Sequence, residues 1–357
     1  MPRNDSRLQL SRRSFLGLAG ASIVHAALPG RARAAAATEI RGVNFAFVDV
    51  DRAKVATCNT KGRNASIGGR GFLKRYQEAG VRDAVRASLG RLRESGVTAI
   101  RHNLWFIGGD RAPQDVFRVA DAGLAADRMG QFAQDMRRAG LEQLFLALSP
   151  VGESVPGCRK VEWGDCFRPE GTQAAMGFLT QVANAAAGPA LYVDGFNEGV
   201  PSEALKPPVR AAMMEYLGTC LATIAALRPA PRIVVSTQGN RADERVAILD
   251  QVLRRTGVRL DVLDIHVYRG RGTGPDGGTL ARFRDFAAAR GARLLVGEIQ
   301  ADDGLIGRVR QALGRGDGRD PLGYFPWPLA DAATGCHVDM DVPDMIGTLR
   351  RMRPPGG

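Results

Sequence analysis

Short apolar runs of strand type alternate with amphipathic segments of helical spacing from residue 40 onward, and this alternation limits the fold more than any other feature. Val81, Val85, Leu89 and Leu92, for example, place apolar side chains on one face of a helix. Strands and helices in strict alternation require a parallel sheet with right-handed crossovers. The expected strands cover residues 40–45, 98–101, 144–148, 190–193, 232–236, 262–266, 293–298 and 322–325.

Eight such units predict an α/β chain folded as a closed (β/α)8 TIM barrel, in one domain over residues 38–357. An open doubly wound sheet is the alternative, and it predicts a glycine-rich phosphate loop after the first strand. The segment VNFAFVDVDR at 43–52 contains no such loop. The closed barrel is therefore the favoured prediction.

Residues 1–37 have the layout of an export signal. The stretch SRRSFL at 11–16 is a twin-arginine pattern, residues 15–28 form a short apolar segment, and alanines at 34–37 offer a cleavage site. The apolar segment is shorter than the roughly 20 residues that a membrane span needs. A disordered basic arm is the alternative, but it explains only the arginines. We expect export by the twin-arginine route to the periplasm or exterior, with no stable membrane insertion after cleavage.

The charge of the chain is concentrated in this segment. It holds six arginines and one aspartate, so the remaining chain keeps about +7 of the formal net charge of +12. There the basic residues are dispersed among acidic ones, as on solvated helix faces, and nucleic-acid binding is not expected. We expect a monomer that uses no metal and no organic cofactor.

The five cysteines are too few for a disulfide scaffold and lack the CxxC spacing of a zinc site. Export to an oxidising compartment permits disulfides. Cys58 follows the first strand and Cys336 the last, and these strands are neighbours where the barrel closes, so we predict that they pair. Cys158 and Cys166 share one loop and are predicted as a second pair. Cys220 is expected to be a buried free thiol in a helix.

Polar residues follow the expected carboxyl ends of several strands, where the active sites of (β/α)8 barrels lie. Glu198 ends the fourth strand and Glu298 the seventh, so two carboxylates are expected to face each other across the mouth. Glycoside hydrolysis uses such a pair, one protonated to assist the leaving oxygen and one ionised to attack the anomeric carbon. Arg101 favours the charged form of a nearby carboxylate, whereas burial and the partner's charge keep the other protonated.

These residues carry a resemblance to a known group of enzymes. Arg101, the pair Asn197-Glu198, the stretch DIHVY at 264–268, Glu298 and Trp327 occur in an order similar to that of clan A retaining glycoside hydrolases. Family 5 cellulase-like enzymes resemble the chain most, followed by family 39, over about residues 40–352. The motifs of this resemblance are single residues at strand ends.

The resemblance implies that Glu198 is the acid/base and Glu298 the nucleophile. Asn197 would bond the sugar 2-hydroxyl, His266 would orient the acid/base, and Trp327 would form the floor of the subsite. Arg101 and Tyr268 would hold the nucleophile. The glycines on either side of Phe196-Asn197-Glu198 would let the backbone pass close to substrate.

The sequence also departs from family 5, whose members usually carry a histidine at the end of the third strand. The stretch LFLALSP at 144–150 offers only Ser149 there, and we expect His102 to substitute in part. Trp105 and Trp163, expected in loops at the mouth, suit the apolar faces of sugar rings. Asp339 and Asp341 have no convergent partners in sequence, so no metal site is expected.

The expected function is therefore a retaining β-glycosidase that hydrolyses β-linked glucan or a related polysaccharide or oligosaccharide. Two alternatives stay open. A carbohydrate-binding barrel without activity would need the aromatic residues but not both glutamates, and a transglycosylase acting on exopolysaccharide would use the same glutamates. Sugar identity, linkage and endo or exo action depend on the loops around the mouth.

Overall fold

The computed structural model describes residues 40–45, 47–48, 67–68, 72–108, 116–150, 169–200, 207–268, 276–300, 302–314 and 320–327. The chain divides into two units, Met1–Ala37 and Thr38–Gly357, and the described residues belong to the second. The expected signal, Trp163, Asp339 and Asp341 lie outside the described residues. So do the four cysteines of the two expected disulfides, Cys58, Cys158, Cys166 and Cys336, and both pairings stay predictions.

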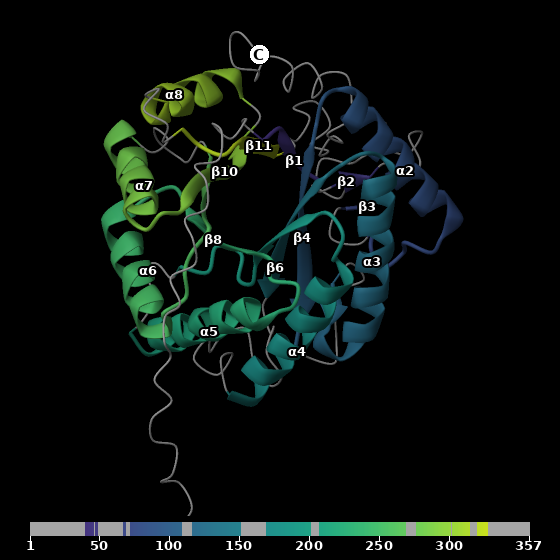
Figure 1. Ribbon diagram of the computed structural model, residues 1–357, viewed down its shortest axis with the longest axis horizontal. Helices are drawn as coiled ribbons and strands as arrows, with labels where there is room; N and C mark the ends of the chain where they lie inside the picture. Colours follow the sequence, from purple (N-terminus) through teal and green to yellow (C-terminus); the bar gives the residue numbers. More distant parts are fainter. Residues whose placement is uncertain are drawn as a thin grey trace, which may run out of the picture. The chain divides into compact units, whose positions relative to one another are not determined.

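Eight parallel strands form the main sheet (Figure 1). A parallel bridge between Ile40 and Gly323 brings its two edges together, so the sheet is a nearly closed barrel. The predicted (β/α)8 fold is thus confirmed. In order around the barrel the strands are β1 (Gly42–Asn44), β4 (Ala99–Ile107), β6 (Gln143–Pro150), β7 (Ala190–Asp194), β8 (Arg232–Gln238), β9 (Val262–Val267), β10 (Arg293–Gln300) and β11 (Tyr324–Trp327).

Three short strands lie beside this path. The strand β2 (Phe47–Val48) pairs with β3 (Ile67–Gly68) in an antiparallel arrangement. The strand β5 (Phe117–Arg118) extends the sheet next to β4.

Helices surround the barrel, as Figure 1 shows. The expected apolar face of the first is buried, since Val81, Val85, Leu89 and Leu92 are all inaccessible to solvent. Among the described helices, none is long and apolar enough to cross a membrane. The helical elements are α2 (Ala79–Glu94), the short 3-10 helix η1 (Val119–Asp121), α3 (Ala122–Arg138), α4 (Pro169–Ala185), α5 (Pro207–Ala226), α6 (Ala242–Thr256), α7 (Gly277–Ala289) and α8 (Asp303–Leu313).

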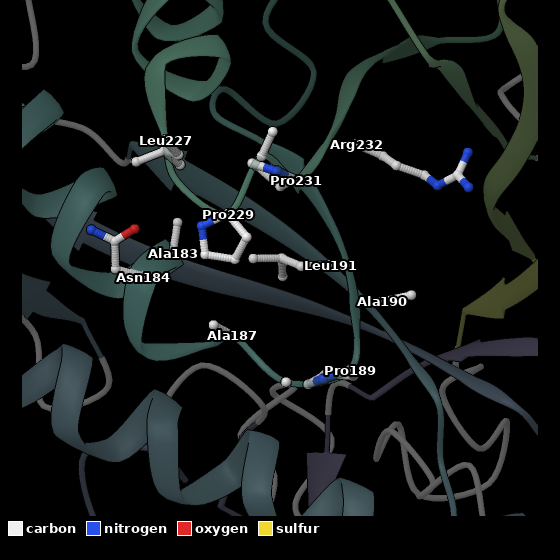
Figure 2. A pocket seen from close by; sticks show the side chains of 12 residues that line it. Ala183, Asn184, Ala187, Pro189, Ala190, Leu191, Leu227, Pro229, Pro231 and Arg232 are labelled. Atoms are coloured by element: carbon white, nitrogen blue, oxygen red, sulfur yellow. The ribbon is translucent and has the colours of Figure 1, made fainter.

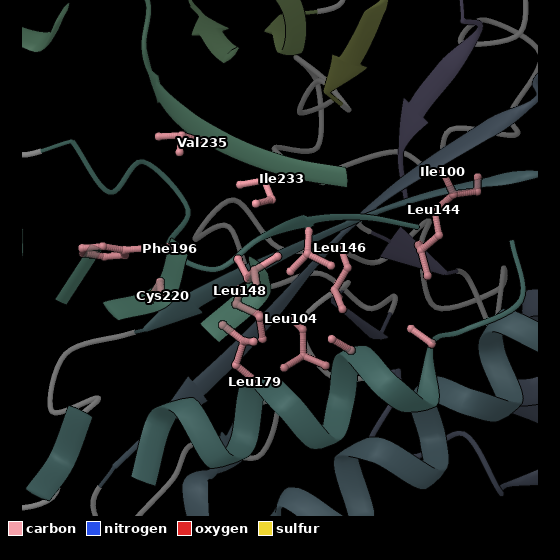
Figure 3. Packing of buried hydrophobic residues seen from close by; sticks show 14 of the residues in the cluster. Ile100, Leu104, Leu144, Leu146, Leu148, Leu179, Phe196, Cys220, Ile233 and Val235 are labelled. Atoms are coloured by element: carbon pink, nitrogen blue, oxygen red, sulfur yellow. The ribbon is translucent and has the colours of Figure 1, made fainter. Parts of the chain in front are cut away.

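The larger of two apolar cores lies between the strands and the helices. Because successive strand residues point to opposite faces, every second side chain faces outward toward a helix. Figure 3 shows such outward residues, Leu104 of β4 and Leu146 of β6, on the side of Leu179 of α4. Cys220 of α5 belongs to this core and is a buried free thiol, as predicted.

A smaller core fills the barrel interior near the amino ends of the strands. Its members come from the inward positions of successive strands, and Phe145 and Tyr192 stack at a ring separation of 4.0 Å. This layer fills the barrel interior at the amino ends of the strands, as branched and aromatic side chains do in this fold. The layer consists of Ile40, Ala99, Phe145, Tyr192, Val234, Val262, Leu295, Leu322 and Phe325.

Candidate active site

On five of the strands the barrel interior changes from apolar to polar toward the carboxyl end. Because side chains alternate with a period of two, the residues above the apolar layer also point inward. They are buried and polar on five strands, which is costly unless they bond one another. These residues are Asn44, Arg101, Asp194, Ser236 and Asp264, each at most 3% exposed.

Arg101 is the central cation of this polar layer. Its Nη1 donates to Glu298 Oε1 at 2.5 Å and to Asn44 Oδ1 at 3.1 Å. Its Nη2 donates to Asn197 Oδ1 at 2.7 Å and its Nε to Asp264 Oδ2 at 3.3 Å. Burial disfavours the guanidinium charge, but the carboxylates of Glu298 and Asp264 outweigh it and raise the pKa of Arg101. A permanently charged group on β4 thus organises side chains from β1, β9, β10 and the end of β7.

Glu298 reaches the interior because β10 contains an irregularity in register. Leu295 pairs with Asp264 and Glu298 with His266, so three steps on β10 match two on β9. Simple alternation from the inward Leu295 would point Glu298 out toward the helices. An extra residue re-aims the following side chain, as β-bulges do near active sites.

Asp264 holds this irregularity in place. Its Oδ1 accepts the backbone N–H of Gly297 at 2.7 Å, while its Oδ2 bonds Arg101. Only glycine fits at 297, because a Cβ there would overlap both carboxylate oxygens of Asp264. The Gly297-Asp264 contact therefore fixes the backbone just before Glu298.

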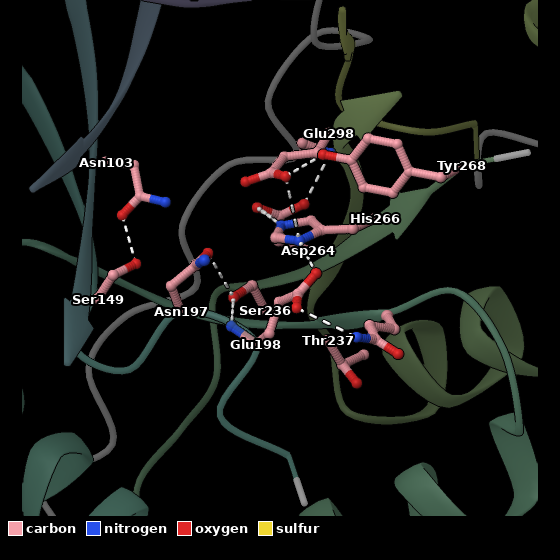
Figure 4. A network of polar contacts seen from close by, with 12 residues as sticks. Asn103, Ser149, Asn197, Glu198, Ser236, Thr237, Asp264, His266, Tyr268 and Glu298 are labelled. Atoms are coloured by element: carbon pink, nitrogen blue, oxygen red, sulfur yellow. Dashed lines mark hydrogen bonds and ion pairs between the residues drawn. The ribbon is translucent and has the colours of Figure 1, made fainter. Parts of the chain in front are cut away.

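Glu198 lies beyond β7 in an unusual backbone conformation. Its φ is 54°, in the left-handed region that residues other than glycine rarely occupy. Ser236 Oγ accepts its backbone N–H at 2.7 Å and so stabilises this conformation, as Figure 4 shows. The side chain is 32% exposed, which leaves it open to a ligand in the mouth.

His266 lies between the two glutamates (Figure 4). Its Nδ1 is 2.9 Å from Glu198 Oε1 and 3.6 Å from Glu298 Oε2, and its Nε2 is 3.0 Å from Arg101 Nη2. Burial disfavours the imidazolium, but the charges of Glu298 and Asp264 raise the pKa of His266 to about 10. Because a carboxylate can only accept, Nδ1 carries a proton and donates it to Glu198 Oε1.

The two carboxylates are close together. One oxygen of Glu198, one of Glu298 and a ring nitrogen of His266 lie within 4.8 Å of one another. These three side chains could offer ligands to a cation, but Glu298 Oε2 accepts the hydroxyl proton of Tyr268, and Glu198 Oε1 accepts from His266. Within the described residues the two carboxylates thus lie close to one imidazole, and each accepts a hydrogen bond from a neighbouring side chain.

The electrostatic environments of the neighbouring groups differ. Burial alone would raise the pKa of Glu198, but hydrogen bonds from His266 and Gln238 and the charge of Arg101 lower it below its usual value. Burial and the neighbouring Glu298 carboxylate raise the pKa of Tyr268, which keeps its phenol protonated as a donor. In the unliganded protein Glu198 is therefore ionised.

Six of the nine expected site residues come together: Arg101, Asn197, Glu198, His266, Tyr268 and Glu298. Trp327, half-buried at the end of β11, lies on the inward face because it is two residues beyond the inward Phe325. Trp105 was expected in a loop, and this is wrong, because β4 continues to Ile107. Its alternation with Arg101 places it on the inward face near the mouth.

The expectation that His102 substitutes for a site histidine is wrong. It is one residue from Arg101 and therefore points to the opposite face, where it packs between Phe72 and Phe132. Burial lowers the pKa of His102 to about 4, and Nδ1 donates to Phe45 O at 3.3 Å. Ser149, at the end of β6, donates to Asn103 Oδ1 at 2.5 Å.

The two glycines around the Asn197-Glu198 pair have a packing role, and their expected close approach to substrate stays a prediction. A Cβ on Gly195 would contact Leu179, Cys220 and Ile224 of the surrounding helices. A Cβ on Gly199 would collide with Phe196. Both glycines thus let the loop after β7 pack closely on its own neighbours.

Three contributors were absent from the sequence prediction. Asn44 donates through Nδ2 to Gly297 O at 2.8 Å and to Phe325 O at 3.0 Å, which ties β1 to β10 and β11. Ser236 and Gln238 contact Glu198 from β8. All three are polar residues at the ends of apolar strands, a signal that was visible in the sequence.

A separate cavity of about 260 Å³ lies at the opposite ends of the strands, where β7 and β8 begin (Figure 2). It is bounded mainly by alanine, proline and leucine side chains, with Asn184 and Arg232 as its polar members. The active sites of this fold lie at the other end of the barrel. The carboxylate cluster is therefore the candidate active site.

No protein-family model matches the chain, and no curated protein matches it either. Among solved structures, a β-mannanase from the blue mussel Mytilus edulis is similar with a TM-score of 0.55 and 13% identity, over 88% of this chain and 91% of that one. A β-1,4-D-mannanase from Cryptopygus antarcticus gives 0.52 and 12%, over 87% and 88%. A family 5 xyloglucanase from Paenibacillus pabuli gives 0.50 and 11%, over 75% and 90%. The chain shares the fold of (β/α)8 glycoside hydrolases, and identities this low assign no specific family.

Proposed function

We propose that the protein is a retaining β-glycosidase that hydrolyses β-linked polysaccharides or oligosaccharides, with Glu298 as nucleophile and Glu198 as acid/base. The proposal rests on the two glutamates, which approach within 4.8 Å at the carboxyl ends of the strands. Retaining glycosidases hold their carboxyl groups about 5–5.5 Å apart, whereas inverting ones leave room for water at about 6.5–9.5 Å. The observed approach favours the retaining arrangement.

Glu298 has the environment of a nucleophile. Arg101 and the Tyr268 hydroxyl each donate to one of its oxygens, which fixes the position of the carboxylate in the mouth. In the first step a carboxylate oxygen attacks the anomeric carbon, and the bond from this carbon to the leaving oxygen breaks. The product is a glycosyl ester on Glu298, which water then hydrolyses.

Glu198 supplies the proton to the leaving oxygen and later accepts one from the attacking water. It is ionised in the unliganded protein, so it must gain a proton when substrate binds. Its side chain is 32% exposed, and a sugar in the mouth would exclude water from it and disfavour its charge. His266 holds the carboxyl group of Glu198 in place through its contact with Oε1.

The amide of Asn197 is oriented toward the sugar side. Its Oδ1 accepts from Arg101 Nη2, so its amino group is the part that can donate to a sugar hydroxyl. The inward placement of Trp105 and Trp327 supports their proposed contact with the apolar faces of sugar rings. Trp163 keeps the same proposed role.

The first test measures reducing-sugar release from β-mannan, xyloglucan, β-glucan and xylan by the purified protein. β-Mannan and xyloglucan lead this panel because similar folds carry the names mannanase and xyloglucanase. We expect release by the wild type, none by Glu298→Gln, and about 10²–10⁴-fold less by Glu198→Gln. Proton NMR of the first product should show retained β configuration. An inverted product, or full activity in Glu298→Gln, would contradict the mechanism.

We further propose that residues 1–37 direct export by the twin-arginine route, on the basis of the SRRSFL stretch and the apolar segment after it. Replacement of Arg12 and Arg13 with lysine should retain the full-length precursor inside the cell. Periplasmic or secreted product from that variant at wild-type levels would contradict the proposal.

A further inference from the structure

Gln238 is an exposed residue at the end of β8 with an unusual pair of contacts. Its Nε2 donates to Glu198 Oε2 at 3.2 Å, and its Oε1 accepts from Arg245 Nη2 at 3.2 Å. Two residues earlier on the same strand, Ser236 Oγ accepts the backbone N–H of Glu198. Because residues two apart share a strand face, β8 holds both the backbone and the side chain of Glu198.

The direction of the Gln238 amide matters because its two ends have opposite effects on a carboxylate. The amino end stabilises the negative charge of Glu198, whereas the carbonyl end would repel it. Arg245 can only donate, so its contact with Oε1 leaves the amino end facing Glu198. The arginine therefore selects one of the two amide orientations.

Arg245 is itself held firmly. It lies in the first turn of α6, is 4% exposed, and donates through Nη1 to Val200 O at 2.8 Å and to Thr237 Oγ1 at 3.3 Å. Its Nε donates to Asn240 O at 3.1 Å. The side chain thus connects the backbone just after Glu198 to the end of β8.

Each oxygen of Glu198 consequently has its own donor. His266 Nδ1 serves Oε1, and Gln238 Nε2 serves Oε2. A proton on Glu198 would leave a hydroxyl oxygen, which accepts a hydrogen bond more weakly than a carboxylate oxygen does. The arrangement stabilises the ionised form more than the protonated form.

We propose that Gln238, oriented by Arg245, is a positioning residue that keeps Glu198 ionised until a ligand occupies the mouth. The inference rests on the proposed function only in naming Glu198 as the acid/base. Other charged or titratable groups lie around Glu198 and Gln238. They are Arg101 on β4, His266 and Tyr268 on and just after β9, Glu298 on β10, and Arg245 on α6, which contacts Gln238.

The test follows the ¹³C carboxyl resonance of Glu198 through a pH titration of the full chain, with the resonance assigned by its loss in Glu198→Gln. In Gln238→Met the pKa of Glu198 should rise, because one donor to the carboxylate is lost. Arg245→Lys keeps the positive charge but cannot hold the amide in the same way, so the pKa should rise there too. The double variant should show no further rise beyond Gln238→Met.

Gln131→Met is the matched control, because this glutamine bonds Asp127 on α3 instead of a site residue, and it should leave the titration unchanged. An unchanged pKa of Glu198 in Gln238→Met would overturn the proposal. A wild-type value in Arg245→Lys would overturn the orienting role of the arginine.

Activity adds a separate readout. With a glycoside substrate, the alkaline limb of the pH profile of kcat/KM should move to higher pH in Gln238→Met. A titration that shifts while no glycoside is cleaved would count against the glycosidase function and still support the positioning role.

Discussion

Arg101 Nη1 lies 2.5 Å from Glu298 Oε1, and the two side chains are 1% and 7% exposed. Arg75 and Glu78 lie at the same distance, 2.5 Å, but are 49% and 54% exposed. The two ion pairs have the same distance but differ in their exposure to water. Water screens the exposed pair, whereas the buried carboxylates depend on Arg101 for their compensation.

Replacement of Arg101 with methionine should therefore destabilise the protein by about 3–5 kcal/mol, the usual cost when a buried pair loses one partner. Urea unfolding at pH 7 measures the change. Arg75→Met is the control and should differ little from the wild type. Equal losses in the two variants would show that burial does not govern the Arg101-Glu298 pair.

Gly297→Ala should disturb the backbone that aims Glu298. The new methyl group would overlap the Asp264 carboxylate, so either Asp264 or the strand must move, with a destabilisation of about 1–3 kcal/mol. The proposed glycosidase activity should fall as well, because Glu298 follows directly. Thermal unfolding and kcat measure the two effects.

Gly90→Ala is the matched control for that substitution. Gly90 lies within α2, and nothing lies within 4 Å of a Cβ built there. Alanine should stabilise the helix by up to about 1 kcal/mol and leave kcat unchanged. Loss of stability in both variants would mean that the overlap at Gly297 is not the cause.

The convergence of the site could be predicted because strand ends meet at one mouth in a (β/α)8 barrel. Glu198, His266 and Tyr268 needed only the order of the strands. The prediction for His102 is wrong because one step along a strand reverses the face, and both faces of β4 are buried at Arg101 and His102. Trp105 is expected in a loop because the stretch HNLWFI at 102–107 mixes polar and apolar residues without a clear alternation, so the end of β4 could not be predicted from it.

Two features had no readable signal. Leu295 and Glu298 are three residues apart, so simple alternation would place Glu298 outside the barrel, and only the irregularity at Gly297 turns it inward. The contact between Gln238 and Arg245 depends on how α6 begins after Arg241, whose φ is 51°. Such contacts follow from loop geometry rather than from periodicity.

His102 should make the protein less stable in acid. Its pKa is about 4 in the folded protein and 6.5 ordinarily, so the unfolded chain binds the proton first as pH falls from about 6.5 to 4. Over that window the wild type should lose about 3 kcal/mol that a non-titrating residue would keep. The unfolding free energy of His102→Phe relative to the wild type should therefore rise by about this amount between pH 8 and pH 4. A relative stability that does not depend on pH would refute the burial of a neutral histidine.

Asp194 should act in the opposite direction. It is 3% exposed, its Oδ2 has no hydrogen-bond partner among the described residues, and burial raises its pKa from 3.8 to about 6. The folded protein keeps this proton while the unfolded chain releases it, so stability falls as pH rises from about 4 to 6. The difference in unfolding free energy between Asp194→Asn and the wild type should thus grow by about 3 kcal/mol between pH 4 and pH 8 in favour of the variant. Comparison across pH removes any constant effect of the amide group on stability. If the difference in unfolding free energy does not change with pH, the pKa of Asp194 is not raised by folding. Because His102 and Asp194 have opposite signs over nearly the same window, their contributions largely cancel in the wild type, and each one is revealed by its own variant measured against the wild type.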